Sequence, residues 1–95
     1  MLKGQSRYQV PQDVVFTKLK EGEGVLLHLG SKLYYSLNGS GSFLWQLMES
    51  KEAQTIDELS ARLEAHYQIP PQQAHSDCDE LLRELLGEGL IEKVS

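Results

Sequence analysis

The amino-acid sequence predicts an α+β domain in which a three-stranded antiparallel sheet is followed by three helices. Residues 14–37 are rich in β-branched, aromatic and leucine residues, and glycine-containing turns interrupt them, which is typical of a meander of strands. Residues 40–87 instead repeat apolar residues at helical spacing. Because strands and helices are segregated along the chain, the helices are expected to cover one face of a small sheet.

The chain is expected to form a single domain over residues 1–95, with an ordered core at about residues 14–91. Its 95 residues are too few for a second hydrophobic core. Hydrophobic residues make up 40% and charged residues 24%, which argues against a disordered, collagen-like or membrane-embedded chain.

Three strands are expected, over residues 14–20, 25–29 and 33–37. A three-residue turn over 30–32 would place six side chains on one apolar face: Val25, Leu27, Leu29, Leu33, Tyr35 and Leu37. The opposite face would carry Leu26, His28, Tyr34 and Ser36. A two-residue turn would mix the faces, because a shift of one residue moves every side chain to the other side. The short connections make the third strand an edge of the sheet.

Three helices are expected, near residues 40–49, 56–67 and 71–87. Asn38 or Ser40 can cap the first, and Thr55 with Glu58 forms a capping box at the start of the second. Pro71 suits the first turn of the third helix. Trp45 is expected to anchor the core between the first helix and the sheet.

The third helix carries two neighbouring stripes of side chains. The first is expected in the core and consists of Ala74, Cys78, Leu81 and Leu85. The second lies beside it and consists of His75, Asp79, Leu82 and Leu86. Gly89 is placed as a left-handed residue after the helix, with Leu90 packing back on Leu85 in a Schellman arrangement.

The distribution of charge argues against nucleic acid and membrane surfaces as partners. The net charge is −5, and residues 49–95 hold 11 acidic residues against 4 Lys and Arg. A winged-helix DNA-binding regulator, the alternative that this order of elements suggests, would place the acidic third helix against phosphates. A single cysteine, no signal peptide and no long apolar run make the cytoplasm the expected location.

No catalytic group, metal site or cofactor site is predicted. The turn at residues 39–42 matches neither the P-loop nor the dinucleotide fingerprint, and a strand-to-helix connection explains it. His66, His75 and Cys78 do not follow a zinc-ligand spacing. Cys78 is expected to be a small buried thiol, and the helix carboxylates are expected to form a solvated face. An enzyme is therefore not expected.

Residues 24–48, GVLLHLGSKLYYSLNGSGSFLWQLM, resemble the PqqD-like family, also called RiPP recognition elements. The family pattern is an apolar strand, a tyrosine-bearing strand ending in Leu-Asn, a turn of small residues, and a helix with an aromatic residue. Residues 55–70 and 75–91 resemble the second and third helices of the family, so the resemblance covers residues 14–91. Ser40-Gly41-Ser42 stands where the family often has Thr-Gly-Ala.

The resemblance implies a winged helix-turn-helix-like domain that binds the leader segment of a ribosomally made precursor peptide. The domain would present the peptide to a modifying enzyme, such as a radical S-adenosylmethionine enzyme or a leader peptidase. Quinone-cofactor, lasso-peptide and thioether-peptide pathways use such domains, and the sequence does not distinguish them. An edge that is simply too short to matter is the alternative for the third strand.

The leader is expected to add as a strand to the third strand and to rest against the third helix. On the strand, the expected contacts are Lys32, Leu33, Tyr34, Tyr35, Ser36 and Leu37. On the helix, they are His75, Cys78, Asp79, Leu82, Arg83 and Leu86, with Arg83 pairing to a leader carboxylate. Helical spacing leaves open which stripe faces the strand.

Overall fold

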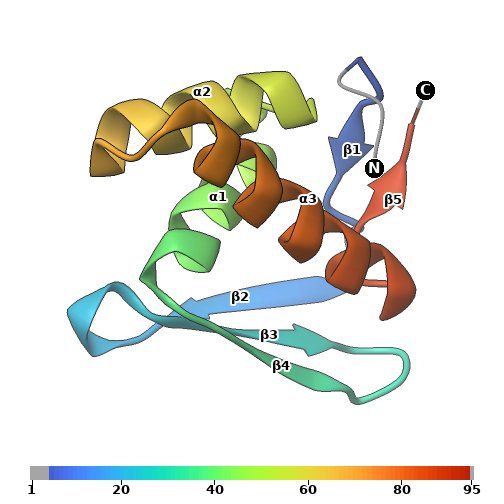
Figure 1. The fold of residues 1–95 in the computed structure, drawn as a ribbon. Coiled ribbons are helices and arrows are strands. Elements are labelled where there is room, and N and C mark those ends of the chain that lie inside the picture. The colour runs from blue at the N-terminus through green and yellow to red at the C-terminus, as the bar shows by residue number, and fades with distance from the viewer. Residues whose placement is uncertain (1–4, 95) are drawn as a thin grey trace.

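The computed structural model describes residues 5–94 and confirms the predicted α+β fold. Its main sheet has the strand order β2-β3-β4, and all three helices lie on one face of it (Figure 1). The strands are β2 (Val14–Lys18), β3 (Gly24–His28) and β4 (Tyr34–Leu37), and a short 3-10 helix, η1 (Lys20–Gly22), joins the first two. The helices are α1 (Gly39–Glu49), α2 (Ile56–Tyr67) and α3 (Pro71–Gly87).

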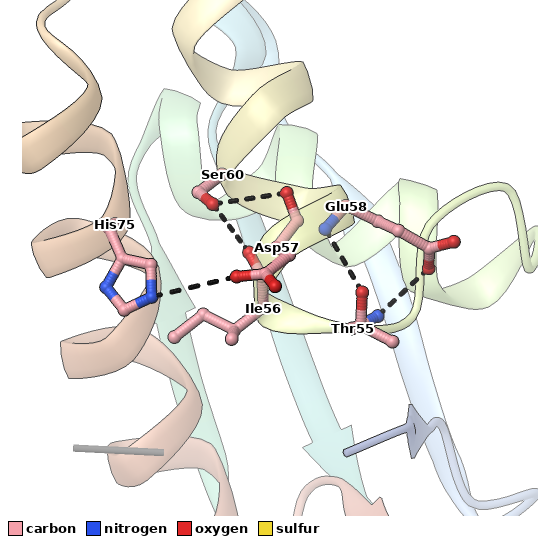
Figure 2. A network of polar contacts seen from close by, with 6 residues as sticks. All are labelled: Thr55, Ile56, Asp57, Glu58, Ser60 and His75. Carbon is pink, nitrogen blue, oxygen red and sulfur yellow. Dashed lines mark hydrogen bonds and ion pairs between the residues drawn. The ribbon is translucent and has the colours of Figure 1, made fainter. Parts of the chain in front are cut away.

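The helix boundaries agree with those predicted, because local capping sets them. The Asn38 side chain accepts a hydrogen bond from the Gly41 N–H (2.8 Å) and thereby begins α1. Thr55 and Glu58 form the reciprocal capping box of α2, shown in Figure 2. After α3, the Leu90 N–H bonds to the Leu85 carbonyl (2.8 Å) and Gly89 has φ +71°, which confirms the Schellman ending.

A second, two-stranded sheet was not predicted. It pairs β1 (Tyr8–Gln9) with β5 (Glu92–Lys93), beside the end of α3 (Figure 1). The Tyr8 side chain is 1% exposed and belongs to the core. Two-residue strands at opposite ends of a sequence leave no local pattern, so only the folded structure reveals them.

The predicted register of β3 and β4 is wrong by one residue, since Leu26 lies opposite Tyr35. Counted between the hydrogen-bonded residues His28 and Leu33, the turn has four residues rather than three. It ends at Lys32, which adopts a left-handed conformation (φ +65°) and donates its N–H to the His28 carbonyl (2.8 Å). The helix-facing side of β3 is therefore the one that carries Leu26, which is fully buried, and not the one that carries Val25.

The core lies between this face of the sheet and the helices. Trp45 is fully buried there, as predicted. On α3, the buried stripe consists of Ala74, Cys78, Leu82 and Leu85. Leu82 is 1% exposed while Leu81 is only partly buried, so the predicted assignment of these two residues is wrong. Both choices are compatible with a 3.6-residue period, and the packing of α3 on α2 decides between them.

Candidate functional site

Among residues 5–94, the strand β4 pairs only with β3 and is therefore an edge of the main sheet. Hydrogen-bonded positions alternate along an antiparallel pair, and the His28 N–H bonds to the Leu33 carbonyl at 2.9 Å. On β4 the bonded positions therefore continue at Tyr35. The N–H and C=O groups of Tyr34 and Ser36 point away from β3 and are available to another strand.

A cavity of about 530 Å³ lies beside this edge, between β4 and α3. Three parts of the chain form most of its wall: β4 and the residue after it, the first turns of α1, and one face of α3. The lining residues are Glu23, Tyr35, Ser36, Leu37, Asn38, Ser40, Gly41, Leu44, Asp77, Glu80, Leu81 and Glu84. The cavity thus combines a strand edge with a helix face, which is the setting of strand addition.

Glycine at position 24 permits the close approach of elements at one end of this cavity. A Cβ atom there would lie 2.4 Å from Cε1 of the Phe16 ring and 3.3 Å from the Ser42 hydroxyl oxygen in α1. Gly24 lies opposite Leu37, at the end of β4. A larger residue at position 24 would therefore require the Phe16 ring to move.

Apolar side chains and carboxylates both contribute to the cavity wall. Leu37 and Leu44 are each 3% exposed, so they present little surface, while Leu81 is partly buried. On α3, the lining residues follow the spacing i, i+3, i+4 and i+7, which places them on one helix face: Asp77, Glu80, Leu81 and Glu84.

A hydrogen bond connects β4 to α3 across this site. The Tyr35 hydroxyl donates to Oε2 of Glu84 at 2.5 Å. Burial raises the pKa of Tyr35 to about 12, and the hydrogen bond and charge of Glu84, with the charges of Glu88 and Glu80, add to the effect. The phenol is therefore protonated at neutral pH and remains a donor that holds the Glu84 carboxylate in position.

The structure brings three of the predicted strand residues to the cavity, namely Tyr35, Ser36 and Leu37. Leu33 is partly buried against the core. Lys32 lies in the turn, and the Tyr34 side chain is 70% exposed on the opposite face of the sheet.

The predicted residues of α3 do not line this cavity. Cys78 and Leu82 are in the core, and Leu86 is partly buried against it. The His75 ring lies toward Asp57 at the start of α2, with 4.0 Å between Nε2 and Oδ1 (Figure 2).

Arg83 and Asp79 form an ion pair with each other, in which the Arg83 Nε donates to Oδ2 of Asp79 at 2.9 Å.

The lining residues of α3 were not predicted as a group; they are Asp77, Glu80, Leu81 and Glu84. Their spacing places them on one helix face, but the sequence predicts a core position for Leu81 and a solvated face for the carboxylates.

Burial also determines the chemistry of the cysteine. Burial raises the pKa of the Cys78 thiol to about 12, and the charge of Asp77 adds to the shift. The thiol is fully protonated at neutral pH, which is the opposite of an activated nucleophile. Within residues 5–94, no three His, Cys, Asp or Glu side chains lie together in a position to hold a metal ion.

No helix in the described part of the chain is long and apolar enough to cross a membrane. A comparison with curated protein sequences finds no significant match.

Two solved structures resemble the fold closely. One is titled TbiB1 in complex with the TbiA(beta) leader peptide; it shares 28% identity at a TM-score of 0.79, over 92% of this chain and 98% of that one. The other, a lasso peptide synthetase B1 complexed with the leader peptide, shares 19% identity at a TM-score of 0.76, over 90% and 98% of the two chains, and supports the fold alone. Residues 23–91 match the family described as coenzyme PQQ synthesis protein D. The chain therefore belongs to the PqqD family.

Proposed function

We propose that this protein binds the leader segment of a ribosomally synthesised precursor peptide and presents the peptide to a modifying enzyme. The observation that carries the proposal is the free edge of β4 beside the cavity at α3. The leader adds to β4 as a fourth strand, and its side chains on the helix side enter the cavity. The domain acts as an adaptor, and the chemistry belongs to the enzyme.

Backbone hydrogen bonds supply the sequence-independent part of the binding. The outward N–H and C=O groups of Tyr34 and Ser36 each find a partner in the added strand, which gives up to four new bonds. Two further observations favour a leader as this strand. The chain belongs to the PqqD family, and TbiB1, at 28% identity, was solved in complex with a leader peptide.

Side chains around the cavity supply the specificity. We assign this role to Leu81, Glu80 and Glu84 on α3, and to Tyr35 and Leu37 on the helix-facing side of β4. Cys78 and Leu82, which the sequence suggested as contacts, support the site through the core that positions α3. The partner enzyme is expected to be a radical S-adenosylmethionine enzyme or a leader peptidase.

Amide NMR with a synthetic leader tests the strand addition. The probe is the N-terminal segment of the short precursor peptide that we expect to be encoded beside the gene for this chain. On binding, the amides of Tyr34 and Ser36 are expected to exchange with solvent more slowly, while those of β2 keep their rates. A saturating leader that protects β2 amides instead would show that the peptide uses the other edge.

A further inference from the structure

The cavity beside β4 has a strongly acidic wall. Four carboxylates line it, from Glu23, Asp77, Glu80 and Glu84. Lys, Arg and His are absent from the lining as far as residues 5–94 are concerned. The carboxylates do not define the site, because the free strand edge and the cavity do so independently. They determine which leader side chains the site accepts.

The wall also contains apolar side chains beside these charges. Leu81 is partly buried at the side of the lining face nearest the buried stripe of α3, while Leu37 and Leu44 present little surface. A leader side chain that matches this wall therefore needs methylene groups to pack on Leu81 and a positively charged end to pair with a carboxylate. Lys and Arg have this construction, with an aliphatic stem and a cationic end. Asp or Glu at the same position would be repelled.

We propose that the leader recognised by this protein carries Lys or Arg at positions that face α3, with Glu80 and Glu84 as their ion-pair partners. The inference rests on the proposed function, because it assumes that the peptide adds to β4. It extends that function by naming the chemical class of the leader, which the family assignment leaves open.

The Tyr35 hydroxyl prepares Glu84 for this role. A carboxylate accepts about four hydrogen bonds, so the bond from Tyr35 to Oε2 leaves the other oxygen of Glu84 free to accept from a cation. The bond also fixes the rotamer of Glu84, which lowers the entropy that an ion pair loses on forming.

The spacing of the two glutamates suggests a pattern in the leader. Glu80 and Glu84 are four residues apart, which is about 6 Å along a helix axis. Side chains on one face of a strand recur about every 6.8 Å. Two basic residues separated by one residue therefore match the two carboxylates.

Selection from a random peptide library tests the proposal and does not require the natural leader. A library of random 12-residue peptides, displayed by covalent linkage to their mRNA, is selected against four forms of the full chain. They are the wild type, the double variant Glu80→Gln and Glu84→Gln, the control double variant Glu49→Gln and Glu64→Gln, and the edge variant Ser36→Pro. The control makes the same change in charge at carboxylates that do not line this cavity.

The wild type and the control are expected to enrich peptides with Lys or Arg at alternating positions. The Glu80/Glu84 variant is expected to enrich peptides without this basic excess, and Ser36→Pro to enrich few peptides. Peptides that depend on Ser36 but show no basic excess would overturn this inference and leave the proposed function intact. Peptides that do not depend on Ser36, or no enrichment at all, would overturn both.

Calorimetric titration of one selected peptide provides the quantitative check. Each removed carboxylate is expected to weaken binding about two- to fivefold, as partly exposed ion pairs do. A Lys→Gln change in the peptide is expected to weaken binding by the same factor to the wild type and by less to the Glu80/Glu84 variant. Equal loss for both proteins would refute the pairing.

Discussion

Substitution of Ser36 by proline is the most direct perturbation of the proposed binding edge. The N–H of Ser36 points away from β3, so its removal takes no hydrogen bond from the folded domain. Tyr35, the preceding residue, is already extended, which is the conformation that a following proline favours. The variant is therefore expected to keep its fold while losing one of the donors that a leader strand would use.

The size of the effect follows from that single donor. A backbone hydrogen bond contributes about 0.5–1.5 kcal/mol, and a leader carbonyl left buried without a donor adds about 1–3 kcal/mol. Part of this penalty is relieved by water at the open edge. We therefore expect a loss of about 1.4–2.8 kcal/mol, which is about tenfold to a hundredfold in Kd.

Isothermal calorimetry with a leader peptide measures this loss, and circular dichroism checks the fold. Lys18→Pro is the matched control. Lys18 lies on β2, the other edge of the sheet, and the bond from the Leu19 N–H to the Glu23 carbonyl shows that the Lys18 N–H also points outward. The control is expected to bind as the wild type does. A folded Ser36→Pro variant with wild-type affinity would refute addition of the leader to β4.

Further predictions concern stability, reactivity and nucleic acid. The pKa of Tyr35 is about 12 in the folded state and about 10 in the unfolded state. The contribution of Tyr35 to the free energy of unfolding is therefore complete below pH 10 and is lost as the pH rises toward 12. In denaturant titrations, the free energies of unfolding of the wild type and of Tyr35→Phe should differ less at pH 12 than at pH 8. Hydrogen bonds from the N–H groups of Gln54 and Thr55 lower the pKa of Glu58, so the capping box stabilises the fold above the ordinary pKa of a glutamate and loses this effect as the pH falls through the lowered value. Thr55→Ala is expected to cost about 1 kcal/mol in urea unfolding at pH 7, and an unchanged midpoint would contradict the role of the cap. The buried Cys78 thiol is expected to react with a disulfide reagent only after denaturation, and fast labelling of the native protein would show that α3 opens. Because the net charge is −5, the protein is not expected to shift duplex DNA in a gel at moderate salt. Tight, salt-sensitive binding of the protein to DNA would favour a DNA-binding transcription regulator instead.

Local signals made the helices predictable. The capping pair Thr55 and Glu58 sets the start of α2, and Gly89 sets the end of α3, through residues within a few positions of each boundary. These signals act within the unfolded chain as well as in the fold, so they survive in the sequence. The free edge was predictable for a related reason, because short turns leave the third strand without a second neighbour.

Two features could not be predicted, namely the register of β3 with β4 and the face that α3 turns to the core. For each of them, the sequence is compatible with two alternatives. The length of the loop between β3 and β4 depends on Lys32, which adopts a left-handed conformation. Turn statistics do not anticipate this conformation for a residue other than glycine. Leu81 and Leu82 are adjacent, and either completes an apolar stripe. Because that choice rotates α3 by one residue, it determines whether the carboxylates or the stripe with Leu82 line the cavity beside β4.

The pairing of β1 with β5 has a consequence for how this domain can be linked to other proteins. Tyr8 lies opposite Lys93, and β1 and β5 lie side by side (Figure 1). Because paired strands are about 5 Å apart, residues 8 and 93 are neighbours in space. Such a unit can be inserted into a surface loop of a host protein without stretching either connection. Residues 8 and 93 do not line the peptide cavity, so an inserted copy would keep its cavity open. An enzyme that lacks substrate recognition could thus acquire it by receiving this domain as a single inserted module.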